Sequence, residues 1–197
     1  MKSRVFGESH PQVALTLLKL ADVMQEQRKY SMAKPLHEQA LVIRRRAFGE
    51  QHAEVAASLT KLGGLCEAQR QLDRAVDYYE KAIAVWKEIY GSLHPVVADT
   101  LSLLGSVHDQ LTDYESALAC FEGALAMKTT ICGEDSPLLD SAISNLAFCL
   151  KKLGQYERAR PHFERLLEMR LAQYGEDHTA VASASNNLGL LLKKLKL

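Results

Sequence analysis

The chain has 197 residues, of which 47% are hydrophobic, a proportion typical of folded globular proteins and unlike that of disordered segments. It holds 24 Lys and Arg against 24 Asp and Glu, and this zero net charge argues against strong electrostatic binding of nucleic acid or anionic membrane. The sequence contains no apolar run of the ~18–20 residues that a membrane span needs, and no signal peptide. Its four Cys lack paired spacing, so we expect a cytoplasmic protein without membrane insertion.

Glycines and prolines recur along the chain with a period of 42 residues. All five prolines keep this period, and so do eight of the eleven glycines, including Gly49, Gly91 and Gly133. A fixed period of ~20–50 residues indicates an array of structural repeats. We therefore predict a single domain over 1–197, with repeats at 10–51, 52–93, 94–135 and 136–177, a partial repeat or capping helix at 178–197, and the tail of a preceding repeat at 1–9.

The first repeat shows two apolar stripes with helical spacing. One lies at 13–24, and its helix is expected to begin at Pro11, because proline is favoured at the first helical position. The other lies at 33–47 and predicts a second helix, with Pro35 in its first turn and Gly49 as a left-handed cap. One hairpin cannot bury its own apolar face. The sequence therefore predicts an all-α protein, a right-handed α-solenoid of stacked antiparallel helix hairpins.

Small residues follow Leu on each first helix, and an Ala-x3-aromatic pattern marks the second helix. In the second repeat these residues are Leu62, Gly63, Ala75 and Tyr79. The pattern resembles the tetratricopeptide repeat, whose usual length is about 34 residues. The longer period and the Phe-Gly-Glu-Gln-His connection at 48–52 resemble the tetratricopeptide domain of kinesin light chains. The resemblance implies a non-catalytic protein-interaction module that binds an extended peptide or partner segment in a concave groove, as in kinesin light chain-like cargo adaptors.

The first helices of such an array line its concave surface, so their polar positions form the expected groove. These positions are acidic toward the helix ends in the first three repeats and carry lysines in the last two, which favours a peptide of mixed charge. Hydroxyl and amide groups there could pair with a peptide backbone. The alternative is an ordinary solvated polar face. The candidates are Lys19, Asp22, Lys61, Ser102, Ser144, Asn145, Phe148, Lys152, Asn186 and Asn187.

The last helix ends in a strongly apolar segment at 190–197. This segment predicts a further repeat, a partner, or self-association through the C-terminal helix. It supports an alternative function as a structural or self-associating scaffold segment of a larger signalling or ciliary protein. A third hypothesis places a catalytic domain outside the chain.

The sequence shows no arrangement of residues that indicates enzyme activity, a cofactor or a bound metal. Four of the seven His are periodic, so they lie about one repeat apart and cannot share one ion; we expect them at helix N-caps. Trp86 takes a slot held elsewhere by Arg44, Lys128 and Arg170, which are expected to reach solvent. It is therefore a candidate for an outer contact, and local packing is the competing explanation.

Overall fold

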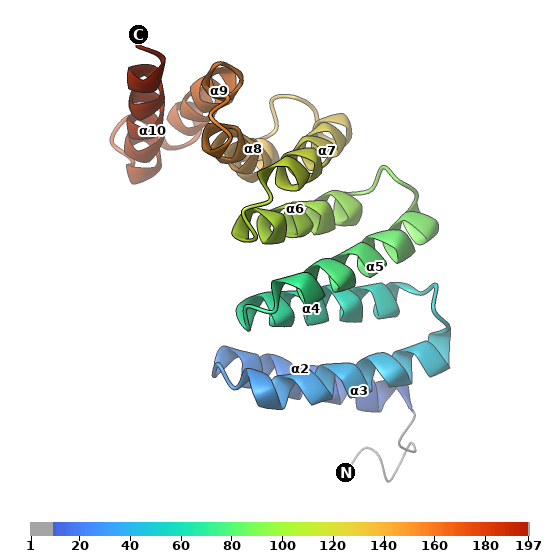
Figure 1. Cartoon of the computed structure of the whole chain (residues 1–197). Helices are drawn as coiled ribbons and strands as arrows, with labels where there is room; N and C mark the ends of the chain where they lie inside the picture. The colour runs from blue at the N-terminus through green and yellow to red at the C-terminus, as the bar shows by residue number, and fades with distance from the viewer. Residues whose placement is uncertain (1–9, 197) are drawn as a thin grey trace. The chain divides into compact units, whose positions relative to one another are not determined.

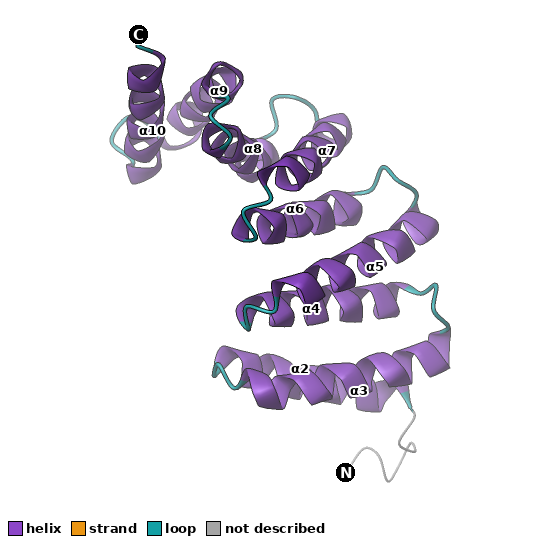
Figure 2. Cartoon of the chain, viewed as in Figure 1, coloured by secondary structure: helices purple, strands orange, loops and turns teal. Residues whose placement is uncertain are grey.

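A computed structural model of the protein describes residues 10–196, and all regular secondary structure in this range is helical (Figures 1 and 2). The segment 1–9, predicted as the tail of a preceding repeat, lies outside the described residues. The first-type helices, each the first of its repeat, are α2 (Pro11–Glu26), α4 (Ala53–Ala68), α6 (Pro95–Gln110), α8 (Asp140–Lys152) and α10 (Thr179–Leu195). The second-type helices are α3 (Tyr30–Phe48), α5 (Leu72–Tyr90), α7 (Tyr114–Cys132) and α9 (Tyr156–Tyr174). The predicted all-α class is confirmed.

The chain forms two compact units, the first ending at Thr100 and the second beginning at Leu101, inside α6. In the first unit α2 packs on α3, α3 on α4 and α4 on α5. In the second unit α7 packs on α8, α8 on α9 and α9 on α10. Each of these helices therefore buries its apolar stripe against its neighbours in the sequence, which is the packing expected of helix hairpins in a repeat array.

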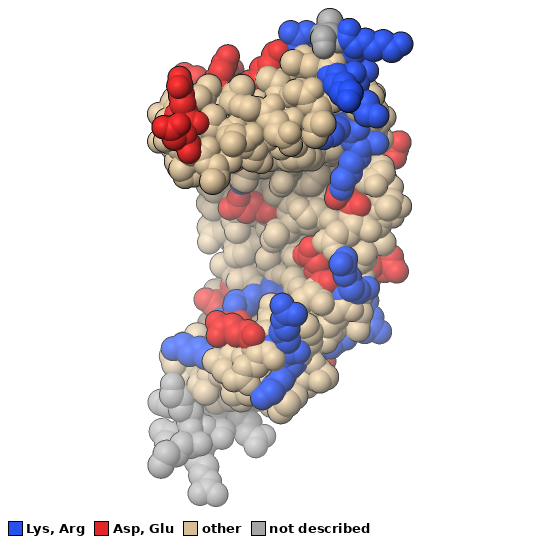
Figure 3. Space-filling model, turned by 90° about the vertical axis from the view of Figure 1, so that its left-hand side faces the viewer, with Lys and Arg blue, Asp and Glu red and all other residues tan. Residues whose placement is uncertain are grey.

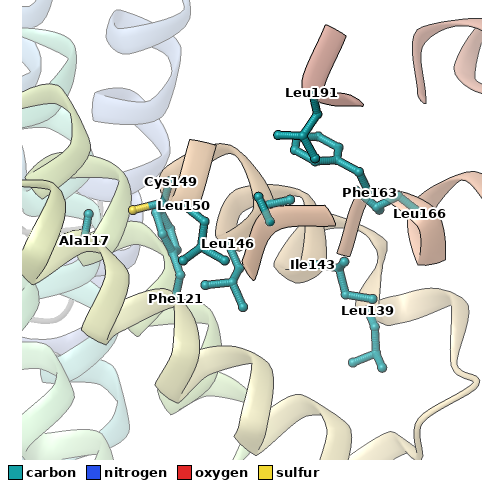
Figure 4. Packing of buried hydrophobic residues seen from close by; sticks show 12 residues of the cluster. Ala117, Phe121, Leu139, Ile143, Leu146, Cys149, Leu150, Phe163, Leu166 and Leu191 are labelled. Atoms are coloured by element: carbon teal, nitrogen blue, oxygen red, sulfur yellow. The ribbon is translucent and has the colours of Figure 1, made fainter. Parts of the chain in front are cut away.

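The second unit contains a continuous hydrophobic cluster drawn from consecutive elements (Figure 4). Ile143 and Leu150 of α8 are at most 1% exposed, and Phe163 of α9 and Leu191 of α10 pack into the same cluster. A buried aliphatic or aromatic side chain contributes roughly 1.5–3 kcal/mol relative to an exposed one. The cluster therefore stabilises the packing of α7, α8, α9 and α10 against one another.

Small residues on the first-type helices allow an aromatic ring of the second-type helix to approach closely. A Cβ added at Gly63 would lie 2.7 Å from the ring of Tyr79, and one added at Gly105 would lie 2.7 Å from the ring of Phe121. Both rings are buried, with exposures of 1% and 4%. The glycine of the Leu-Gly pattern and the aromatic residue of the Ala-x3-aromatic pattern therefore pack against each other.

The turn inside each hairpin places one residue in the left-handed region. These residues stand 42 apart and have φ values of 57° at Arg28, 61° at Arg70, 62° at Thr112 and 72° at Gly154. In the first repeat the Lys29 amide donates to the Met24 carbonyl and the Arg28 amide donates to the Gln25 carbonyl. This pair of hydrogen bonds is the Schellman motif, which usually has glycine at the left-handed position. Only the fourth repeat follows that preference.

The glycine after each second-type helix has a backbone conformation that differs from the predicted left-handed cap. Gly49 has φ 83° and ψ 172°, and Gly91 has φ 80° and ψ 173°. This combination is open essentially to glycine alone, and it turns the chain into an extended connection rather than a further helical turn. The prediction of glycine was right, but the predicted left-handed geometry was wrong.

The periodic histidines cap the first-type helices, as predicted. The Nδ1 atom of His52 accepts from the Glu54 amide at 3.1 Å, and its ring stacks on Phe48 at 4.4 Å between centroids. His94 stacks on Tyr90 at 4.3 Å and accepts from an amide in the same manner. The aromatic-Gly-x-x-His connection therefore satisfies one free amide at the helix start and covers it with a ring pair.

The second-type helices begin earlier than the apolar stripe predicted. α3 begins at Tyr30, so Pro35 lies inside the helix instead of in its first turn. A proline at this position cannot donate to the carbonyl of Ser31, four residues earlier. The prediction for Pro35 was wrong because α3 begins before Ala33, the first residue of the apolar stripe.

The fourth repeat departs from the others where it begins. Ser136 replaces the capping histidine and accepts from the Leu138 amide at 3.3 Å, while Cys132 replaces the stacked aromatic residue. A short 3-10 helix, η1 (Pro137–Leu139), takes the place of the first turn, and α8 starts at Asp140. The connection of this repeat therefore lacks the ring pair that covers the helix start in its neighbours.

Candidate functional site

All ten predicted groove residues lie on first-type helices. Lys19 and Asp22 are on α2 and Lys61 is on α4, all in the first unit. The remaining seven are on α6, α8 and α10 in the second unit.

The first unit has a hollow of about 590 Å³ between α2 and α4. Lys61 crosses it and forms hydrogen bonds from Nζ to both carboxylate oxygens of Asp22, at 2.7 and 2.9 Å. Glu26 and Tyr30 also line the hollow, whereas Lys19 is exposed and does not. The structure therefore brings together two predicted residues from adjacent repeats.

The second unit has a smaller hollow, of about 200 Å³, between α6 and α8. Lys152 contacts Asp109 there, with Nζ at 2.7 Å from Oδ1 and 2.5 Å from Oδ2. Asn145 and Phe148 line the same hollow. Three predicted residues of α8 thus converge beside a carboxylate of the preceding repeat.

Phe148 gives the hollow of the second unit an aromatic wall. It is 37% exposed, meets the ring of Phe163 edge-on at 5.3 Å, and has the Lys151 ammonium 5.8 Å from its centroid. Cys149 lies at the buried base, where burial raises the pKa of its thiol to about 11. This thiol is therefore protonated at neutral pH and offers no nucleophile.

The other predicted residues lie outside these two hollows. Ser102 and Ser144 are half-buried, Asn186 is exposed and Asn187 is half-buried. The Ser102 carbonyl accepts from the Ser106 hydroxyl at 3.0 Å. These side chains stay on the predicted face without a described cavity between them.

Tyr30 lines the hollow of the first unit but was not among the predicted groove residues. It is the first residue of a second-type helix, and the groove was predicted from first-type helices alone. The same slot holds Leu72, Tyr114 and Tyr156, so its recurrence along the 42-residue period was the available signal. Lining residues at the ends of second-type helices thus escape a prediction that considers one helix type.

Each hollow contains both an acidic and a basic side chain, and the two form an ion pair. The predicted acidic and basic ends meet at the Asp109–Lys152 pair, where each residue contacts one of opposite sign. In the first unit, Figure 3 likewise shows basic and acidic side chains side by side on the face turned to the viewer. A surface pair of this kind is worth only about 0–1 kcal/mol, so either partner can exchange to a ligand at little cost.

The Trp86 slot is more buried than expected. Trp86 is 7% exposed and stacks on Tyr90 at 5.7 Å, so most of its ring is unavailable to a partner. Arg44 is 8% exposed and donates to the Glu54 carbonyl and the Ser58 hydroxyl, while Arg170 donates twice to Asp140, at 2.7 and 2.8 Å. The expectation that these arginines reach solvent was wrong, because each finds carboxylate or carbonyl oxygens on a first-type helix.

The described residues set limits on other chemistry. Between residues 10 and 196, His, Cys, Asp and Glu nowhere gather in the groups of three or more that a metal site requires. Across the same range, each helix is too short or too polar to cross a membrane.

A family model for the tetratricopeptide repeat matches residues 12–87, 54–130 and 138–196. The chain belongs to the tetratricopeptide repeat family. This membership confirms the predicted resemblance, and it makes a protein-interaction module the general function that the fold supports. No curated relative matches the sequence.

Solved structures of kinesin light chain-like repeats share the tetratricopeptide fold. The "nearly identical TPR-like repeats" of a candidate kinesin light chain from Podosopora anserina match with a TM-score of 0.82 and 19% identity, covering 95% of this chain and 89% of that one. A single-substitution variant of that protein gives the same TM-score and identity. BtubC (BKLC) from P. vanneervenii matches with a TM-score of 0.77 and 23% identity, covering 86% of this chain and 68% of that one. At these identities the likeness concerns the fold.

Proposed function

We propose that this tetratricopeptide repeat protein is a non-catalytic adaptor module that binds an extended peptide along its first-type helices. The observation that carries the proposal is the recurrence of one arrangement in both units. In each, a hollow lies between consecutive first-type helices and contains a Lys–carboxylate pair that joins adjacent repeats. A peptide with both acidic and basic side chains can exchange with these pairs, since the lysine of each pair is exposed and surface ion pairs are weak.

The hollows differ in what they offer a peptide. The first combines Asp22, Glu26 and Lys61 with the ring of Tyr30, which favours a basic or polar side chain. The second combines Asn145 with the exposed part of Phe148, which favours a backbone segment followed by an apolar side chain. The proposed ligand is therefore a cytoplasmic protein segment of mixed charge that carries at least one apolar residue.

A peptide-display screen against the chain, followed by affinity measurement, tests this proposal. We expect Lys151→Glu with Lys152→Glu to weaken the selected peptides by about tenfold or more, because a close charge pair becomes repulsive. Lys81→Glu with Lys87→Glu, at two exposed positions of α5, is the matched control. Unchanged affinity in the α8 double variant, or the same loss in both double variants, contradicts peptide binding at this site.

A scaffold function is the second candidate, and α10 supports it. Ala182, Ser185 and Gly189 are exposed on one side of this helix, whereas the equivalent Ala56, Leu59 and Gly63 of α4 are buried. No atom lies within 4 Å of a Cβ added at Gly189, and Leu190 beside it is 49% exposed. This face suits a helix of a partner or of a second copy. Sedimentation of the intact chain and of Leu190→Asp distinguishes the two functions, since only self-association predicts a concentration-dependent mass that the substitution abolishes.

A further inference from the structure

A pocket of about 770 Å³ lies where the third repeat passes into the fourth, and none of the predicted groove residues lines it. One wall is a face of α9, from Pro161 to Gln173, and the other is the connection at 134–137. The Arg165 guanidinium spans the two walls by donating to the Glu134 carbonyl. The pocket lies within the second unit, and its size is that of many ligand-binding cavities, which are ~300–1,000 Å³.

The pocket is located where the fourth repeat departs from the repeat pattern. In three other connections a Phe or Tyr ring stacks on the capping His, at 4.3 to 4.5 Å between centroids. Here Cys132 and Ser136 occupy these two slots, and η1 replaces the first turn of the helix. The pocket therefore lies between α9 and the one connection that lacks the ring pair.

The walls of the pocket combine apolar and acidic surface. Pro137, Pro161, Met169 and Ala172 supply the apolar part, and Met adapts readily to a ligand of irregular shape. Leu138, next to the pocket, is 72% exposed. A long side chain with an apolar stem could therefore lie against this surface. The next residue of the same ligand, if apolar, could contact Leu138.

Carboxylates dominate the charge of the pocket. Glu164 is paired with Arg160 at 2.7 Å. The side chains of Glu134, Asp135 and Glu168 form no ion pair with any residue between 10 and 196, and all three are exposed. The Arg165 guanidinium donates to a neutral main-chain carbonyl and keeps its positive charge, but the three unpaired carboxylates outweigh it, so the net charge of the pocket is negative. A cationic ligand would find both a counter-charge and a surface for its stem.

We propose that this pocket binds a basic, apolar segment of a partner protein, with an Arg or Lys stem on Met169 and Ala172 and its charged head between Asp135 and Glu168. The site is separate from the hollows between first-type helices, so the module would hold two polypeptide segments through different faces. An Arg is the better fit, because its planar guanidinium pairs with carboxylates through two hydrogen bonds.

Fluorescence anisotropy with a labelled octapeptide of alternating Arg and Leu tests this site on the intact chain. Two further octapeptides, alternating Glu with Leu and Arg with Ser, separate the charged from the apolar requirement. We expect the Arg–Leu peptide to bind about tenfold or more tightly than either, since both surfaces are then used. Equal binding of the Glu–Leu peptide overturns the proposal.

Matched variants locate the binding. Asp135→Arg with Glu168→Arg should weaken the Arg–Leu peptide by about tenfold or more, because the counter-charges are reversed. Glu80→Arg with Glu88→Arg, two exposed carboxylates of α5, should leave it unchanged, and so should Lys151→Glu with Lys152→Glu in the hollow of α8. Circular dichroism of each variant checks its helix content. The proposal is overturned by an equal loss in the two carboxylate variants.

Two other results would assign the peptide elsewhere. A change of affinity confined to the α8 variant would place the peptide in the groove and overturn the separate site, without affecting the proposed peptide-binding function. A concentration-dependent mass in sedimentation that Asp135→Arg with Glu168→Arg abolishes would make the occupant the basic end of α10 from a second copy. That result also overturns a foreign partner.

Discussion

At the residue scale, His37 shows what happens when one repeat departs from the core pattern. Its slot holds Tyr79, Phe121 and Phe163 in the later repeats, where the ring lies against a small residue of the first-type helix. His37 is fully buried, and neither ring nitrogen has a hydrogen-bond partner in the part of the chain that the structure describes. An unsatisfied buried polar group costs roughly 1–3 kcal/mol.

Burial lowers the pKa of His37 from its ordinary value of 6.5, with Asp22 opposing the shift and Lys61 adding to it. As pH falls below 6.5, the unfolded chain therefore binds a proton before the folded chain does, and the free energy of unfolding decreases. His162, whose pKa is also lowered mainly by burial, acts in the same direction. The protein should lose stability between neutral pH and the lowered folded-state pKa values.

We expect His37→Phe to raise the free energy of unfolding by about 1 kcal/mol at neutral pH and to reduce its decline on acidification. Phe163 beside Ala147 is the precedent, since His37 has Ala21 in the equivalent slot. Denaturant unfolding at neutral pH and at about pH 5 measures both effects. A parallel decline in the substituted and natural proteins would show that His37 is not a source of the pH dependence.

At the element scale, the turn inside the hairpin is set by backbone geometry that three repeats satisfy with unfavourable residues. Thr112 has φ 62°, a conformation that is strained for a β-branched residue, and Gly154 has φ 72° in the same turn of the next repeat. We expect Thr112→Gly to stabilise the protein by about 1 kcal/mol, and Gly154→Ala to destabilise it by a similar amount.

Thermal and denaturant unfolding of the two variants measures these effects. No atom lies within 4 Å of a Cβ added at Gly154, so a loss of stability there reflects backbone strain and not a clash. Gly154→Asn serves as the control, because asparagine tolerates the left-handed region and should cost less than alanine. Effects of the same sign at positions 112 and 154 would contradict a common turn geometry.

At the scale of the whole molecule, periodicity made the helix pairs predictable, whereas individual contacts were not. The 42-residue spacing located the hairpins, the periodic histidine caps and the small residues at Gly63 and Gly105, because these depend on local backbone geometry and on one repeated packing contact. The partners of Lys61 and Lys152 lie in adjacent repeats, and a flexible lysine can reach several carboxylates. The 42-residue spacing therefore does not predict which carboxylate each lysine contacts.

The same reasoning applies to the pocket beside α9, which was not predicted. Cys132 and Ser136 were visible as departures from the aromatic and His slots, but the pattern did not show that η1 replaces a helical turn there or that the connection at 134–137 lines a pocket with α9. A periodic pattern predicts the features that the repeats share. Departures from it indicate where repeats differ, and the structure is needed to learn how.

Because each helix packs mainly on its neighbours in the sequence, we expect a core substitution in one unit to destabilise that unit and not the other. Ile143 of α8 is fully buried in the cluster of the second unit, and Leu62 of α4 is fully buried in the first. Replacing either by Ala should cost about 2–5 kcal/mol. Stability in a repeat array is close to a sum of repeat and nearest-neighbour contributions. The substitution should therefore destabilise mainly the helices that contact the altered helix.

Amide hydrogen exchange resolves this helix by helix. We expect Ile143→Ala to speed exchange in α7, α8 and α9 while leaving α2 and α3 near their natural rates, and Leu62→Ala to speed exchange in α3, α4 and α5 while leaving α9 and α10 unchanged. Each variant is the control for the other, since both remove a buried aliphatic side chain from a first-type helix. If either substitution accelerated exchange equally in every helix, the two units would unfold as one cooperative body. Local unfolding would instead allow the hollow of one unit to be altered without loss of the hollow in the other.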